Sequence, residues 1–91
     1  MLDATWRPSA RRQLEKTIEY VRDRNVTAAE RLESTFHTSV ERLQAMPFIG
    51  RRGRVPATRE WVVHPNYLLI YRVTDEEIII LRVLHARQRY P

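Results

Sequence analysis

The sequence contains no cysteine, so we expect a fold that holds without a disulfide bridge or a thiolate-bound metal. It also lacks a long apolar segment: the runs from Tyr67 to Ile70 and from Ile78 to Leu81 are far shorter than the roughly 20 residues that cross a bilayer. The start of the chain carries no basic flank followed by an apolar stretch. We therefore expect no signal peptide, no membrane contact and a cytoplasmic location.

Motifs for metals and nucleotides are missing as well. No pair of histidines or carboxylates has the helical spacing of metal ligands together with a third ligand. Neither a glycine-rich nucleotide motif nor a nucleophile elbow occurs. The sequence therefore predicts no metal and no cofactor.

Lysine is nearly absent, and arginine takes its place. Lys16 is the single lysine among 16 basic residues, which stand against 11 acidic ones and give a net charge of +5. Residues 47–91 hold eight basic and four acidic side chains, so most of the excess lies in the C-terminal half. Such a local excess indicates an acidic partner, namely nucleic acid, an acidic peptide or an acidic protein surface. Improved solubility is the plain alternative.

The length of 91 residues fits one domain over residues 1–91, which begins with a strand and a helical hairpin. Leu2, Ala4 and Trp6 alternate, which predicts a short strand over residues 2–6. Pro8 suits the first turn of a helix that runs to about Arg24. Its buried stripe would consist of Ala10, Leu14, Ile18 and Val21.

The second helix has clear end signals. Asn25 suits the left-handed cap of the first helix, and Thr27 to Glu30 forms a capping-box sequence for the second. Pro47 ends that helix near Met46. Its buried face would consist of Ala29, Leu32, Phe36, Val40 and Leu43. The short link makes the two helices antiparallel.

The C-terminal half reads as a basic loop followed by strands. Residues 47–58 contain both glycines and three arginines, which predicts a loop. Strands are predicted over residues 59–64, 67–74 and 77–85, and their short connections make an antiparallel meander. The fold class is therefore α+β, with the helices on one face of the sheet.

The first candidate site is the basic loop, where arginines alternate with glycines that let backbone N–H groups approach an anion. Its members are Arg51, Arg52, Arg54 and Arg59. A solvated loop whose arginines pair with acids on the helices is the alternative.

The second candidate site is the end of the chain, where Arg82, His85, Arg87, Arg89 and Tyr90 gather. Alternation places Arg82 and His85 on opposite faces of the last strand, and Tyr90 is expected on a mobile tail. His85 is either a hydrogen-bonding structural residue or a proton-transfer group.

Two arginines interrupt the apolar strands themselves. Arg82 stands within the last predicted strand, and Arg72 stands within the strand before it. An arginine in a buried strand is costly unless it is paired or partly hydrated. Each therefore forms either an internal ion pair or a contact with a target.

The order of these segments resembles the RelE/ParE superfamily of bacterial toxins. The resemblance is carried by Trp6-Arg7-Pro8-Ser9-Ala10 before a helix, by the junction from Arg42-Leu43 through Met46-Pro47 to Gly50-Arg51, and by the strand sequences at residues 59–63, 67–73 and 80–87. It covers nearly the whole chain. It implies the toxin of a type II toxin–antitoxin module on a RelE/ParE-like fold, and fold alone does not choose between the two activities of the superfamily.

The resemblance offers two targets. ParE-like members bind DNA gyrase and trap it on cleaved DNA, in which case the arginines of both candidate sites, Arg72, His85 and Tyr90 would contact that target without catalysis. RelE-like members cut mRNA on the ribosome, in which case the catalytic candidates are Arg54, Arg59, Arg82, His85 and Tyr90.

Three features favour the ParE-like branch. The helical hairpin from Pro8 to Met46 is long, as in that branch. Ribonuclease members carry an arginine after the first tyrosine of the tyrosine-rich strand, where this chain has Leu68. They also place a tyrosine close to the end of the last strand, whereas Ala86 follows His85 here.

Either branch implies a cognate antitoxin that is partly acidic and folds on binding. Candidate docking points are Phe48, Ile49 and Trp61, with core packing as the alternative that we favour for Trp61. A basic binding module without toxic activity is a third interpretation.

Overall fold

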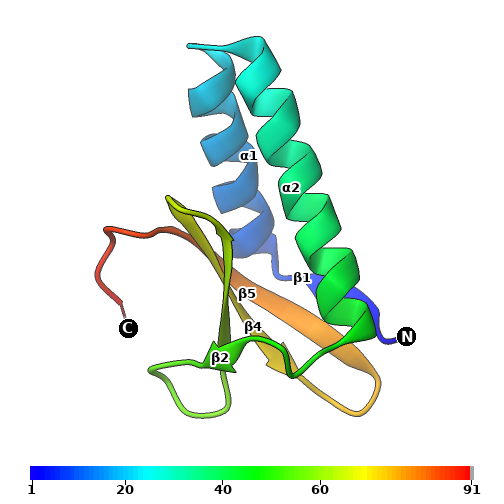
Figure 1. The fold of residues 1–91 in the computed structure, drawn as a ribbon. Coiled ribbons are helices and arrows are strands. Elements are labelled where there is room, and N and C mark those ends of the chain that lie inside the picture. The colour runs from blue at the N-terminus through cyan, green and yellow to red at the C-terminus, as the bar shows by residue number, and fades with distance from the viewer. Residues whose placement is uncertain (91) are drawn as a thin grey trace.

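The computed structural model describes residues 1–90, which form two helices on one face of a five-stranded sheet (Figure 1). In chain order the elements are β1 (Asp3–Trp6), α1 (Pro8–Arg22), α2 (Val26–Ala45), β2 (Arg51–Arg52), β3 (Arg59–His64), β4 (Tyr67–Val73) and β5 (Glu77–His85). The strand order across the sheet is β1-β5-β4-β3-β2. The predicted fold class, the helical hairpin and the three-stranded meander are confirmed.

The two outer strands extend the meander. β1 pairs with β5 in parallel, with Trp6 opposite Ile80, so the N-terminal strand joins the sheet at the edge farthest from β2. β2 pairs with β3 antiparallel. The prediction that residues 47–58 form only a loop was therefore wrong at Arg51 and Arg52, because a two-residue strand leaves no periodicity to detect.

The main core lies between the helices and the sheet. The predicted faces of both helices are buried there, apart from Val21, which is half-buried. They pack against sheet residues that include Leu69, Tyr71, Ile78, Ile80 and Val83. The amphipathic stripes of the helices thus fix which face of the sheet is covered.

The turn between the helices differs from the predicted one. Asn25 does not form a left-handed cap for α1, which ends at Arg22; its φ of −161° is extended. Its side chain instead accepts a hydrogen bond from the N–H of Ala28 at 2.9 Å and so caps the start of α2. Thr27 lies inside the helix, so the predicted capping box at Thr27 was wrong.

A smaller cluster covers the sheet face turned away from the helices, which we call the far face. Its buried residues are Leu68, Ile70, Leu84 and Tyr90, with Val55 and Leu81 packed against them. A register shift between Ile70 and Tyr71 in the pairing of β4 with β5 accompanies this packing. The expectation of a mobile Tyr90 was wrong, because its ring is buried in this cluster, with 6% of its surface exposed.

Candidate functional site

One row of residues crosses the far face from strand to strand. Strand pairing places Arg51 opposite Glu60, Glu60 opposite Ile70, and Ile70 opposite Arg82. Paired residues share a face of a sheet, so this row aligns two cations and one anion around a buried isoleucine. His85 pairs with Tyr67, which packs against the helices, so Arg82 and His85 lie on opposite faces as predicted.

Glu60 is the anion of this row, and it is buried with 4% of its surface exposed. The Arg51 Nε donates to its Oε1 at 2.8 Å, and the Arg54 Nε lies 4.0 Å from its Oε2. The pair joins a buried carboxylate to an arginine whose side chain is 59% exposed, so the desolvation of Glu60 offsets part of the attraction. Of the loop arginines, Arg51 and Arg54 thus pair with an acid on β3, and within residues 1–90 none of them pairs with an acid on the helices.

Arg72 and Arg82 behave differently. Neither forms an ion pair with any acid among residues 1–90. Both are half-buried, and the Arg72 Nε is fully covered without a hydrogen-bond partner within that range. The internal ion-pair alternative therefore finds no support at either residue within residues 1–90.

The far-face arginines continue into a hollow at the end of the sheet. This hollow, the arginine pocket, has a volume of about 630 Å³ and is lined by Phe48, residues 52–59, Arg72 and Val73. Four of the lining residues are arginines and none is acidic: Arg52, Arg54, Arg59 and Arg72. Such a concentration of one charge favours an anionic ligand.

Arg59 is largely committed to the protein itself. Its Nη1 donates to the carbonyl oxygens of Gly50 at 2.8 Å and Phe48 at 3.2 Å, and its guanidinium lies 5.0 Å from the centre of the Phe48 ring. Arg59 therefore holds the segment that leads into β2. It lines the arginine pocket from that position.

The five ribonuclease candidates are not gathered in one place. Arg54 lies beside Tyr90, with its guanidinium 5.0 Å from the ring centre, and Arg82 shares their face of the sheet. Arg59 is held by carbonyl groups, and His85 lies on the helix side.

His85 is further restricted by its own hydrogen bond. Its Nδ1 accepts from the N–H of Arg87 at 3.2 Å, so the neutral ring carries its proton on Nε2. It lines a hollow with Lys16, Tyr20 and Tyr67, away from the arginine pocket. This arrangement suits the structural role of His85 better than general-base catalysis.

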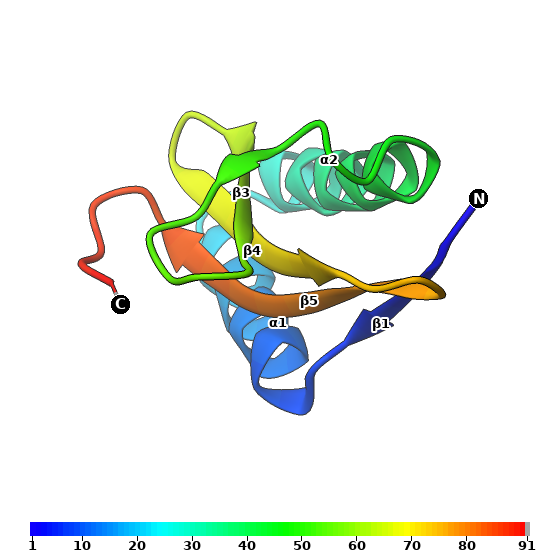
Figure 2. The same ribbon diagram turned by 90° about the horizontal axis from the view of Figure 1, so that it is seen from below.

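The chain after β5 turns back over the far face. Gln88 accepts from the N–H of His85 at 2.6 Å, and Tyr90 offers its carbonyl to the Arg54 Nη1 at 3.4 Å. Arg87 and Arg89 are exposed on this segment. In both ribbon views the segment lies beside the loop between β2 and β3 (Figures 1 and 2).

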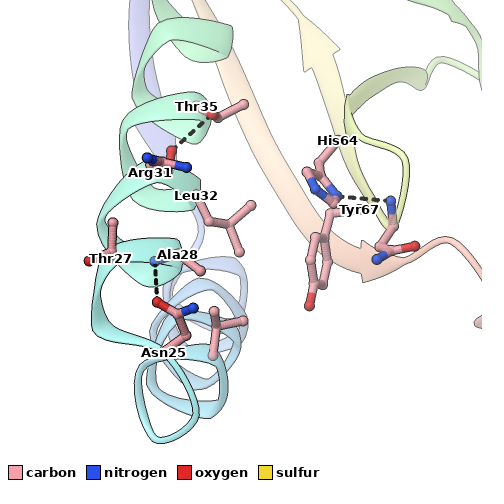
Figure 3. Close-up of a pocket in the computed structure, with 10 residues that line it drawn as sticks. Asn25, Thr27, Ala28, Arg31, Leu32, Thr35, His64 and Tyr67 are labelled. Carbon is pink, nitrogen blue, oxygen red and sulfur yellow. Dashed lines mark hydrogen bonds between the residues drawn. The ribbon is translucent and has the colours of Figure 1, made fainter.

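A separate hollow of about 500 Å³ opens on the helix side (Figure 3). Leu32, Arg31 and Thr35 of α2 lie on one side of it, and His64 and Tyr67 lie across from them. The His64 Nδ1 accepts from the N–H of Asn66 at 3.1 Å, so this histidine holds the turn between β3 and β4. With one charged lining residue, this hollow has no concentrated charge.

Comparison with known proteins identifies the family. Residues 4–90 match the model of the ParE toxin of the type II toxin–antitoxin system parDE. The protein Y4kP of Sinorhizobium fredii, a toxin by its name, is 34% identical over 87 residues, which are 94% of this chain and 90% of that protein. The chain belongs to the ParE toxin family of type II toxin–antitoxin systems.

Solved structures share the fold of this ParE-family toxin. A chain of the chromosomal ParDE system from P. aeruginosa matches with a TM-score of 0.80 and 24% identity, over 93% of this chain and 96% of that one. A copper-bound mutant toxin from Helicobacter pylori matches with a TM-score of 0.75 and 20% identity, over 99% and 100%. The toxin–antitoxin complex DinJ–YafQ from E. coli gives a TM-score of 0.62 and 14% identity, over 92% and 91%.

Two residues important to the site of this ParE-family toxin escaped the sequence analysis. Glu60 holds Arg51 of β2, and Tyr71 fixes the segment before β2 through its hydroxyl. A lone glutamate in a strand of alternating residues, such as Glu60, is typical of a solvent-facing position. Tyr71 resembles any core aromatic residue.

No helix within residues 1–90 is both long and apolar enough to cross a membrane.

Proposed function

We propose that this toxin acts on DNA gyrase in the manner of ParE-like proteins and does not cleave RNA. The observation that carries the proposal is the separation of His85 from Arg82, Arg54 and Tyr90 by the thickness of the sheet. Cleavage by a 2′-hydroxyl needs a base, a donor to the leaving oxygen and a charge to stabilise the phosphorane around one phosphate. Binding and trapping a target needs only a fixed surface, and the match to the ParE family supports the same choice.

The target surface in this proposal is the far face with the segment that covers it. Its contact residues are Arg51, Arg54, Arg82, Arg87 and Arg89, above the buried ring of Tyr90. Arg52 and Arg72 line the arginine pocket instead, and Arg59 and His85 support neighbouring backbone. Arg82 is the contact residue that we test first. It lies on the far face, is half-buried on a strand and has no acidic partner within residues 1–90.

The test adds purified toxin to gyrase, relaxed plasmid and ATP, and measures both lost supercoiling and accumulated linear DNA. Wild-type toxin is expected to produce both effects. Arg82→Gln is expected to weaken them about tenfold, while Arg12→Gln, which removes the same charge from an exposed position of α1, is expected to leave them within twofold. Unchanged supercoiling together with cleavage of ribosome-bound mRNA would replace the proposal with the RelE-like activity.

A cognate antitoxin is the second part of the proposed function. The structural relatives from the ParDE system and the DinJ–YafQ complex belong to toxin–antitoxin pairs. This toxin leaves Met46, Phe48 and Ile49 exposed at 56%, 66% and 37%, next to its basic loop. A partly acidic, partly apolar segment would cover both features. Trp61, in contrast, packs against the main core, as favoured from the sequence.

The antitoxin proposal is tested by co-expressing the tagged toxin with the protein encoded beside it and measuring what co-purifies. A stable complex that also restores gyrase activity is expected. Phe48→Ser is expected to weaken the complex, whereas Tyr20→Ser, at an exposed aromatic residue on α1, is expected to leave it intact. Equal effects of the two changes would contradict docking at Phe48.

A further inference from the structure

The arginine pocket contains donors that the protein itself does not use. Arg52 is exposed and its side chain makes no hydrogen bond or ion pair within residues 1–90. Arg72 lines the same hollow, and its buried Nε has no partner in that part of the chain. Because that Nε is covered by the protein, a ligand in the hollow would meet Arg72 through the atoms that line it, and Arg52 through its exposed side chain.

The number of guanidinium groups indicates the chemistry of the ligand. Arg52, Arg54, Arg59 and Arg72 line one hollow of about 630 Å³ without an acidic residue among the lining. A carboxylate offers two oxygens and is matched by one guanidinium in a bidentate contact. A backbone phosphate likewise carries one charge on two non-bridging oxygens, but a nucleic-acid strand repeats that charge at every nucleotide, so one ligand can supply acceptors to several guanidinium groups.

The surroundings of the pocket indicate a polymer in preference to a single phosphate. Arg87 and Arg89 are exposed on the C-terminal segment, which Arg54 contacts through Tyr90. Phe48 stands in the wall of the pocket with 66% of its surface exposed. Cations in series beside an exposed aromatic ring are the pattern that binds successive phosphates and stacks an unpaired base.

We propose that the arginine pocket binds a backbone phosphate of a single-stranded nucleic acid, with Arg72 and Arg52 as its main contacts. The adjacent Arg87 and Arg89 take neighbouring phosphates of the same strand, and Phe48 stacks on a base. This site is distinct from the far-face surface around Arg82, although the two are continuous through Arg54. It does not depend on gyrase being the target of the toxin.

The experiment measures fluorescence anisotropy of end-labelled 12-nucleotide DNA and RNA strands of one sequence as purified toxin is added, at several salt concentrations. Wild-type toxin is expected to bind with an affinity that falls steeply with salt. Arg72→Gln and Arg52→Gln are each expected to weaken binding five- to tenfold and to lower the salt slope by about one. Arg12→Gln is the matched control and is expected to change affinity less than twofold.

Three outcomes would overturn the proposal. Equal weakening by Arg12→Gln and Arg52→Gln would mean that net charge alone attracts the strand. Absence of binding to both strands would exclude the site, and tighter binding of a polyglutamate peptide, sensitive to Arg72→Gln, would assign the pocket to an acidic peptide. Arg52 is exposed, so Arg52→Gln keeps the test decisive if Arg72→Gln unfolds the protein.

The DNA and RNA strands separate the two sources of the phosphate. Preference for either strand, or none, is compatible with the proposed pocket as long as Arg72→Gln and Arg52→Gln weaken the binding. The gyrase assay is independent of this result: toxin that inhibits gyrase without binding either strand would sustain the proposed function and reject the pocket.

Discussion

The hydroxyl of Tyr71 donates a hydrogen bond to the carbonyl oxygen of Pro47 at 2.7 Å and accepts one from the N–H of Gly50 at 3.0 Å. A residue in the middle of β4 thus fixes the segment that leads from α2 into the basic loop. A Cβ atom at Gly50 would lie 2.5 Å from the Tyr71 oxygen and 2.7 Å from the carbonyl oxygen of Glu60, so only glycine fits this approach. This contact therefore holds the backbone from which β2 and the basic loop begin.

Removing the hydroxyl should therefore destabilise the protein. Tyr71→Phe leaves a buried N–H and a partly buried carbonyl without their partner, and the expected loss is about 1–3 kcal/mol in the free energy of unfolding. Urea denaturation followed by circular dichroism measures it. Tyr20→Phe, which removes an exposed hydroxyl, should change the stability by less than about 0.5 kcal/mol. Equal stability of the two variants would show that the Tyr71 contact contributes nothing.

The same residue gives the fold a sensitivity to alkaline pH. Burial raises the pKa of Tyr71 above its ordinary value of 10.0, although the Gly50 hydrogen bond and the Arg59 charge act in the opposite direction. The unfolded chain then loses this proton at lower pH than the folded chain does. The stability contributed by the neutral hydroxyl is complete below pH 10 and is lost as pH rises through the raised pKa.

Denaturation at a series of pH values from 8 to about 11.5 tests this dependence. The free energy of unfolding should fall over the alkaline part of the series for the wild type and for Tyr20→Phe. The fall should be smaller for Tyr71→Phe, which has no proton to lose at this position. A fall of the same size in all three proteins would place its origin elsewhere.

The cap of α2 offers a test of the helical turn. Asn25→Ala removes the acceptor for the Ala28 N–H and should cost about 1 kcal/mol in the free energy of unfolding. Thr27→Ala should be neutral or slightly stabilising, because Thr27 lies in the first turn of the helix and alanine has the higher helix propensity. Thermal melting of the two variants measures the difference. A larger loss for Thr27→Ala would restore the capping box inferred from the sequence.

These cases show which features the sequence could predict. The buried faces of the helices and the long strands follow from periodicity, because hydrophobic burial imposes a repeat on ten or more residues. The cap at Asn25 could not be separated from the cap at Thr27, since both residue types accept from a helical N–H and they lie two positions apart.

The site was less predictable than the fold. The arginines could be identified because an excess of charge is visible in composition. Their partners could not, because the pairing of Arg51 with Glu60 depends on β2, which has two residues. The burial of Tyr90 likewise depends on the turn of the chain after β5, which tertiary contacts determine.

His85 separates the two candidate activities of the toxin. Its Nδ1 accepts from the Arg87 N–H, and it lies on the helix side of the sheet. If the toxin traps gyrase, His85→Gln should keep supercoiling inhibition within about threefold, because it removes no group from the far face. If the toxin cleaved RNA through this residue, the same change should lower the cleavage rate by 10²–10⁴. The readout is the growth of cells that express each variant, measured beside the gyrase assay. If His85→Gln restores growth and Arg82→Gln does not, gyrase trapping through the far face is rejected.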